Sequence, residues 1–189
     1  MGDRMTELEG AVLGVIWSLG PITAYGVVQR FLASTTPGWS SSTGAIYPAI
    51  KRLTREGLVV GTPELQDRRS TRRLALTDAG KSALRDWIIG LEDWMGGAAV
   101  DPVRTRMNYI GILSRSQQRA WVEKARGNAL GALSEIASFE PDPTGHHREG
   151  VAFAARGAQA DIEARIAWLG EVQELLSRSG DGGRRKRRV

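Results

Sequence analysis

The spacing of apolar residues changes twice in the first half of the chain, and this change is the feature that most restricts the fold. Three early stretches place apolar residues three and four positions apart, which predicts amphipathic helices. Residues 58–76 instead form two short strand-like segments around the polar turn QDRRS, which predicts a two-stranded hairpin. Helical spacing then returns as far as Gly96-Gly97. The three early helices are predicted at residues 6–19, 23–32 and 42–56.

Capping residues support these boundaries. Thr23 can cap the second helix, and Thr77 can cap the helix that follows the hairpin. Ser41 or Ser42 is predicted to cap the third helix, and Gly57 is predicted to end it. The resulting order of helix, helix, helix, hairpin, helix is that of a winged helix-turn-helix.

The third helix has two chemically different faces. Its predicted buried stripe is Ile46, Ala49, Ile50 and Leu53. The opposite face carries Gly44, Pro48, Lys51 and Arg55, flanked by Tyr47 and Arg52. In a helix-turn-helix, this helix lies in the DNA major groove with its first residues near the bases. The small residues Ser41, Ser42, Thr43 and Gly44 would permit that approach. The alternative is an ordinary solvated amphipathic helix.

The hairpin is predicted to act as the wing. Arg68 and Arg69 lie at its tip, and Arg72 and Arg73 follow directly. Alternation within TRRLAL should direct two arginines outward and leave the leucines for packing. The cations would then meet the DNA backbone or the adjacent minor groove. The alternatives are a solubilising tip, or pairing of Arg72 or Arg73 with Glu64.

The location of the net charge of +5 decides how it is interpreted. Residues 181–189 hold five basic residues and one acid, so most of the excess belongs to the end of the chain. The high isoelectric point is therefore a poor argument for DNA binding. The local argument is stronger, because residues 42–73 hold seven basic residues against three acids.

The second half of the chain is predicted to be helical. Helices are expected at residues 101–113, 115–139 and 148–178. The last one carries an apolar stripe that suits a dimer interface, although packing within the monomer is the alternative. The stripe is Ile162, Ile166, Leu169, Val172 and Leu176. The predicted domains are 1–96 (DNA binding), 97–179 (dimerisation and effector) and a disordered basic tail, 180–189.

The strings GPITAYGVVQRF, SSSTGAIYPAIKRLTREGLV and RRLALTDAGKSAL resemble the PadR family of bacterial transcriptional regulators. The resemblance covers residues 8–90 and accounts for Pro48 inside a helix. It implies a homodimer that binds a palindromic operator, with repression relieved by a small effector. It also places Tyr25 near the DNA backbone. The family often has His-Gly before this tyrosine, where the present chain has Thr23-Ala24.

An effector site is harder to place. The chain has six tryptophans, and an aromatic-lined cavity between subunits would suit a flat aromatic or drug-like molecule. The candidate residues are Trp87, Trp94, Tyr109 and Trp121. Arg104 and Arg106 are weaker candidates for a ligand carboxylate. The alternative for each tryptophan is core or interface packing.

Other classes of function lack support in the sequence. The chain has no cysteine, and its two histidines, His146 and His147, are adjacent and lack a spaced third ligand, so we expect no metal or other cofactor. No hydrolase, P-loop or dinucleotide motif is present, so an enzyme is not expected. No apolar run suggests a membrane span, and we expect a cytoplasmic protein. A winged-helix module that binds protein without reading DNA is the alternative function.

Overall fold

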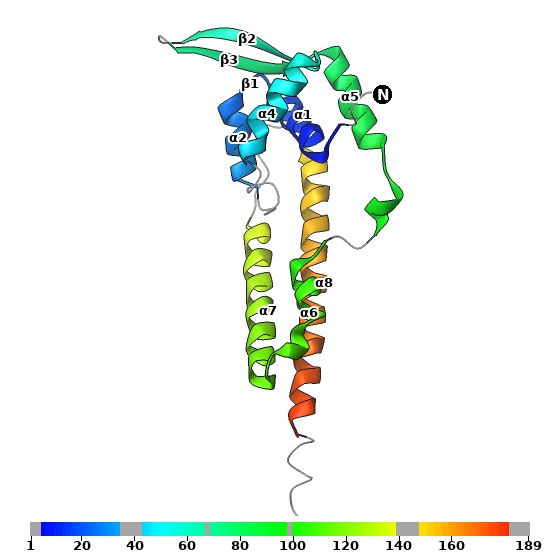
Figure 1. Cartoon of the computed structure of the whole chain (residues 1–189). Helices are drawn as coiled ribbons and strands as arrows, with labels where there is room; N and C mark the ends of the chain where they lie inside the picture. Colours follow the sequence, from blue (N-terminus) through cyan, green and yellow to red (C-terminus); the bar gives the residue numbers. More distant parts are fainter. Residues whose placement is uncertain (1–4, 35–42, 67–68, 98–99, 139–147, 182–189) are drawn as a thin grey trace, which may run out of the picture. The chain divides into compact units, whose positions relative to one another are not determined.

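The structure is a computed structural model, and it describes residues 5–34, 43–66, 69–97, 100–138 and 148–181. The chain forms two compact units, one mainly of residues 1–97 and one mainly of residues 98–189 (Figure 1). The first unit contains α1 (Glu7–Leu19), β1 (Ile22–Thr23), α2 (Ala24–Leu32), α4 (Thr43–Arg55), β2 (Val59–Gln66), β3 (Arg69–Leu76), α5 (Asp78–Ile89) and the 3-10 helix η1 (Asp93–Gly96).

Threonine caps begin three of these helices. The hydroxyl oxygen of Thr23 accepts a hydrogen bond from Gly26 N at 3.0 Å, and that of Thr77 accepts one from Gly80 N at 3.0 Å. Thr6 and Glu9 form a capping box at the start of α1. These bonds satisfy N–H groups that the first helical turn leaves unpaired. The predicted helix starts at Thr6, Thr23 and Thr77 are confirmed.

Helix α4 ends where the sequence predicts. Gly57 has a φ of +73°, a conformation that strongly favours glycine, and it follows the last turn. Pro48 lies inside the helix, as expected. The predicted caps Ser41 and Ser42 lie outside the described residues.

The sheet has three strands, so the prediction of a two-stranded hairpin was incomplete. The strand order is β1-β3-β2, with antiparallel pairing throughout. β1 is the missed strand, and it pairs Ile22 with Leu74 and Thr23 with Arg73. Two residues are too few to show an alternating pattern. The hairpin of β2 and β3 pairs Val59 with Leu76 at its base.

Helix α5 is shorter than predicted. It ends at Ile89 and is capped by Gly90, whose N–H donates to Asp86 O, instead of continuing to Gly96. At its start, Lys81 donates to Asp78 at 3.0 Å. This hydrogen bond and the charge of Lys81 lower the pKa of the Asp78 carboxyl group. The pair therefore belongs to the surface of the first turn of α5.

Helix α1 supplies the centre of the first unit's core. Its side chains Val12, Leu13 and Ile16 are at most 1% exposed. α1 contacts α2, α4, α5 and β3. Trp87 of α5 lies so close to Gly10 of α1 that a Cβ atom at this glycine would overlap the indole ring. α1 thus holds α4 and α5 in one packed body.

The second unit is helical in its described residues. Its elements are α6 (Pro102–Met107), the 3-10 helix η2 (Ile110–Ile112), α7 (Arg115–Ala137) and α8 (Arg148–Asp181). α7 and α8 run side by side in opposite directions (Figure 1). The single helix predicted at 101–113 is in fact two short ones, because Asn108, a poor helix former, caps α6. No described helix is long and apolar enough to cross a membrane.

Part of the predicted dimer stripe on α8 is buried within the protomer. Leu169 is fully buried and Leu176 nearly so, and both pack with Val122 of α7 inside one protomer. Val172 packs against the same cluster. Leu169 and Leu176 are therefore covered by their own chain, and a role of the stripe in a dimer interface stays a prediction. Ile162 and Ile166, the remaining predicted stripe residues, are half-buried.

Candidate nucleic-acid interface

The two faces of α4 differ as the sequence predicts. Ile46, Ala49, Ile50 and Leu53 are buried in the core of the first unit. Gly44, Tyr47, Pro48, Lys51 and Arg55 are exposed. The helix therefore presents a polar, cationic face beyond the domain core. A helix with one such face can enter the major groove of DNA while its other face stays packed.

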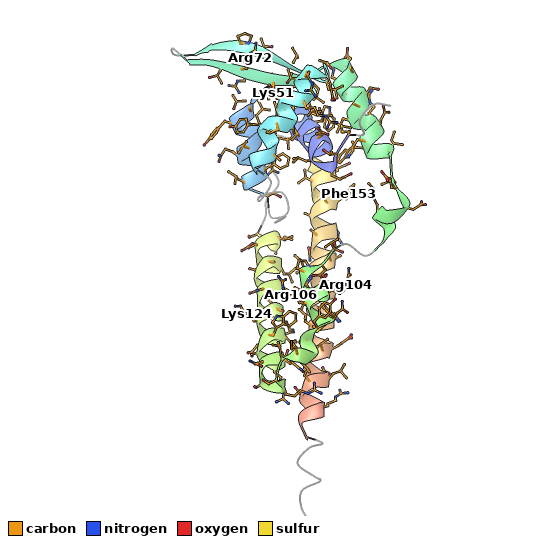
Figure 2. The ribbon with its side chains drawn as sticks, in the orientation of Figure 1. Lys51, Arg72, Arg104, Arg106, Lys124 and Phe153 are labelled. Carbon is orange, nitrogen blue, oxygen red and sulfur yellow. The ribbon has the colours of Figure 1, made fainter. Side chains whose placement is uncertain are left out.

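A groove runs along this face between α4, the start of α2 and the hairpin. Its volume is about 790 Å³, and the residues with chemistry suited to an anion are Tyr25, Lys51, Arg55 and Arg72. Figure 2 shows Lys51 on α4 and Arg72 on β3. The structure thus brings together residues from three elements that the sequence proposed separately.

The pleat of β3 explains why Arg72 reaches the groove. Residues two apart on a strand share a face, so Arg72 lies on the face of Leu74, which packs in the core. Gly61 pairs with Leu74 on the neighbouring strand. A Cβ atom at Gly61 would lie 3.5 Å from Cδ of Arg72, an ordinary contact, so the Arg72 side chain passes directly over this glycine.

Arg73 lies on the other face and has a different environment. It is half-buried, and its guanidinium donates to the carbonyl oxygen of Pro21 at 3.4 Å. This bond joins β3 to the segment before β1. Of the two arginines in TRRLAL, only Arg72 is exposed and lines the groove, which corrects the expectation that alternation directs two arginines outward.

The groove is positively charged along its described lining. Lys51, Arg55 and Arg72 contribute three cations, and no aspartate or glutamate is among the described lining residues. Neighbouring cations in one concave surface add their fields and attract a polyanion. Sequence reasoning missed Thr54, Gly61 and Thr71 as part of this lining. Thr54 follows Lys51 by three positions on a helix, so helical spacing could have identified it.

Arg52 is placed differently from the prediction. Its Nε atom lies 3.2 Å from a carboxylate oxygen of Glu9 on α1 and 3.0 Å from one of Glu56, which directly follows α4. The guanidinium is therefore engaged within the protein, between two helices. Arg52 does not belong to the residues that line the groove. Arg52 thus takes part in an ion pair within the protein, and its DNA contact stays a prediction.

Several predicted contacts fall outside the description. Ser41, Ser42 and Arg68 lie outside the described residues. Thr43 begins α4 and Arg69 begins β3, but only their backbones are described. Their roles in DNA binding stay predictions.

The candidate effector residues do not form one described cluster. Trp87 packs on Gly10, and its Nε1 donates to Glu7 at 3.4 Å. Trp121 packs in the core of the second unit, whereas Tyr109 is exposed. For Trp94 only the backbone is described. Trp87 and Trp121 thus have packing roles, and an effector site at the candidate residues stays a prediction.

Polar residues near α6 also have partners within the second unit. Asp101 caps α6 through Val103 N at 2.8 Å and pairs with Arg165 of α8 at 3.2 Å. Arg106 donates to Pro102 O at 3.3 Å, and Figure 2 labels Arg104 and Arg106 on α6. No group of three or more potential metal ligands occurs among the described residues. His146 and His147 lie outside them.

Comparisons with known proteins match most of the first unit to a family model. Residues 12–86 match the model of the transcriptional regulator PadR-like family. Over 157 residues the chain is 29% identical to the negative transcriptional regulator PadR of Bacillus subtilis (strain 168), and the match covers 76% of this chain and 85% of that protein.

Solved structures share the fold. B. subtilis PadR in complex with operator DNA matches with a TM-score of 0.73 at 21% identity, over 90% of this chain and 99% of that one. PadR in complex with p-coumaric acid matches with a TM-score of 0.68 at 24% identity, over 94% and 99% of the two chains. The predicted mainly helical fold with a small β hairpin is confirmed, with one strand added. Residues 12–86 thus form a PadR-like transcriptional regulator domain.

Proposed function

We propose that this protein is a homodimeric repressor that binds a palindromic operator in double-stranded DNA and leaves it when a small molecule binds. The observation that carries this proposal is the cationic groove of Lys51, Arg55 and Arg72 beside the exposed face of α4. Cations in this arrangement suit phosphates on either side of a major groove. The protein acts in the cytoplasm, as a regulator and not as an enzyme.

The residues divide into two roles. Tyr47, Gly44 and the start of α4 approach the base edges, because the N-terminal part of a recognition helix lies deepest in the groove. Lys51, Arg55, Arg72 and Tyr25 contact the backbone, which sets affinity and register. Arg68 and Arg69 at the wing tip extend this backbone contact. The existence of a complex between the relative PadR and operator DNA supports DNA binding by this fold.

A dimer follows from the length of the DNA that one helix reads. Two copies related by a two-fold axis would read half-sites about 34 Å apart. The second unit supplies the contact, through a face of α8 that its own α7 leaves uncovered. That face carries Phe153, which is 69% exposed, and Leu175, which is 60% exposed. Exposed alanines at 160, 164 and 167 lie between them and allow close helix approach.

Release by an effector is supported by the relative bound to p-coumaric acid. For the present chain we propose a small aromatic or drug-like molecule, bound by the part of the protein that begins at α5. A ligand can shift the equilibrium only by binding the DNA-free state more tightly than the DNA-bound state. A fluorescence screen of aromatic compounds, using tryptophan emission, followed by an operator-release assay, identifies such a ligand.

The proposal is tested by footprinting the protein on the DNA upstream of its own gene and its neighbours. A protected site with two-fold symmetry is the expected result. Equal affinity for every sequence, with no footprint, contradicts the proposal and favours a winged-helix module that binds another protein. Transcription from a promoter that contains the site should fall when the protein is added and recover with the effector.

A further inference from the structure

Glu9 is a buried carboxylate at the junction of two helices. Its residue is only 5% exposed, although glutamate is a residue type that is almost never fully buried without a partner. One oxygen, Oε2, accepts hydrogen bonds from the backbone N and the hydroxyl of Thr6, both at 2.9 Å. The other, Oε1, lies 3.2 Å from Nε of Arg52 on α4. A single side chain thus completes the cap of α1 and pairs with the recognition helix.

The ion pair between Glu9 and Arg52 differs from a surface pair. The side chains are 6% and 23% exposed, so water screens their attraction weakly. Removing one partner would leave a buried charge with less compensation. The pair also joins residues of different helices, and it adds a directional contact to the apolar packing of α1 on α4.

Glu56 provides an internal comparison. It approaches the same Nε atom of Arg52, at 3.0 Å, but its side chain is 40% exposed and it lies four positions further along the chain, directly after the end of α4. An exposed pair between residues four positions apart stabilises the chain locally and weakly, and it does not fix the orientation of the helix. Glu9 and Glu56 therefore place the same charge beside the same guanidinium, but only Glu9 links α4 to another helix.

We infer that Glu9 is a positioning residue for DNA recognition, which it serves by fixing the rotation of α4 about its own axis through Arg52. Arg52 and Lys51 are neighbours on α4, so anchoring the first sets the direction of the second and of Tyr47 one turn earlier. Groups that read a base must be held within about 0.5 Å of their working geometry. Glu9 touches no DNA in this scheme. The inference rests on the proposed function.

The test compares E9Q with E56Q. Each variant removes one negative charge near Arg52, and glutamine at position 9 can still accept a hydrogen bond from Thr6. The measured quantity is the affinity for the operator divided by that for random DNA of the same length. We expect this ratio to fall about tenfold in E9Q, the loss of one good base contact. In E56Q it should change less than twofold.

A direct phosphate contact by Arg52 makes the opposite prediction. R52Q would then lower the slope of log affinity against log salt by about 0.9, and E9Q would leave the ratio unchanged. That pair of results overturns the inference. If Glu9 acts through Arg52, R52Q lowers the ratio without changing the slope. The double variant E9Q/R52Q is then no less selective than E9Q alone, because both changes remove one interaction.

Hydrogen exchange of the free protein keeps the inference falsifiable if E9Q is too unstable for the DNA assay. Amides of α4 should exchange at least about fivefold faster in E9Q/R52Q than in E56Q, while those of α7 and α8 do not change. Equal exchange of α4 in the two variants overturns the inference. A wild-type protein that does not discriminate between sequences refutes the proposed function itself. If E9Q and E56Q lose discrimination to the same extent, the role of Glu9 is refuted, but the proposed function is not.

Discussion

The two units of this protein bury their apolar residues in different ways. The first unit has one core, to which α1, α2, α4, α5 and two strands contribute. The second unit buries Val122, Leu169 and Leu176 between two long helices and leaves Phe153 exposed. A pair of helices has little interior, since each can cover only one side of the other. The first unit therefore has a closed core of its own, whereas the second leaves apolar side chains exposed, as the proposed dimer would need.

The largest expected effect tests whether the first unit is complete. Leu13→Ala should lower its free energy of unfolding by about 4 kcal/mol, because Leu13 is fully buried at its centre. Leu19→Ala, on the same helix but 37% exposed, should cost less than about 1 kcal/mol. Urea unfolding followed by α4 amide signals measures both. The loss of unfolding free energy should be the same at all protein concentrations. A loss that depends on protein concentration would show that the first unit needs a partner.

The next prediction tests the second unit. Phe153→Glu should raise the dimer dissociation constant about a hundredfold, because an unpaired carboxylate in an apolar contact costs about 3 kcal/mol. Ser134→Glu adds the same charge at an exposed site on α7 and serves as the control. Analytical ultracentrifugation over a range of concentrations gives the constant. Equal dimerisation of the two variants would exclude this face of α8 from the interface.

The same contrast explains how far the sequence predicts the structure. The caps at Thr23 and Thr77 and the two faces of α4 depend on residues within one helical turn, and these were predicted. β1 was missed because its pairing with β3 is non-local and only two residues long. The stripe with Leu169 was correctly predicted to be apolar. An apolar stripe, however, can pack equally well against α7 of the same chain or against a second copy of the chain. Spacing shows that a face is buried and does not show what covers it.

The site follows the same rule. Exposure of Lys51 and Arg55 follows from helical spacing, and their predicted position on one face is confirmed. The partner of Arg52 could not be predicted, since Glu9 lies on another helix and reaches Arg52 only through the packing of α1 on α4. A cation on an exposed helix face has several possible partners, and the tertiary fold decides among them.

A smaller effect concerns charge in the first unit alone. Lys51→Ala and Arg72→Ala should each reduce the slope of log affinity against log salt by about 0.9. They should weaken binding to all DNA sequences alike. Lys81→Ala on α5 removes an exposed cation that pairs with Asp78 and should leave the slope unchanged. Dimerisation should be the same in all three. A loss restricted to one operator variant would give Lys51 or Arg72 a base-reading role.

The smallest expected effect lies at Tyr47. Selection of binding sites from random DNA tests base reading by the first unit and dimerisation by the second. Tyr47→Phe removes a hydroxyl group from a half-exposed side chain, so the stability of the first unit should not change. One hydrogen bond is worth about 1 kcal/mol, which is about fivefold in affinity for each half-site. In the proposed dimer, two copies of α4 contact the DNA. Selection from random DNA should therefore show the altered base at two symmetric positions. An altered base at one position only would mean that the second unit does not hold two equivalent copies on the DNA. An unchanged preference would mean that Tyr47 does not read a base.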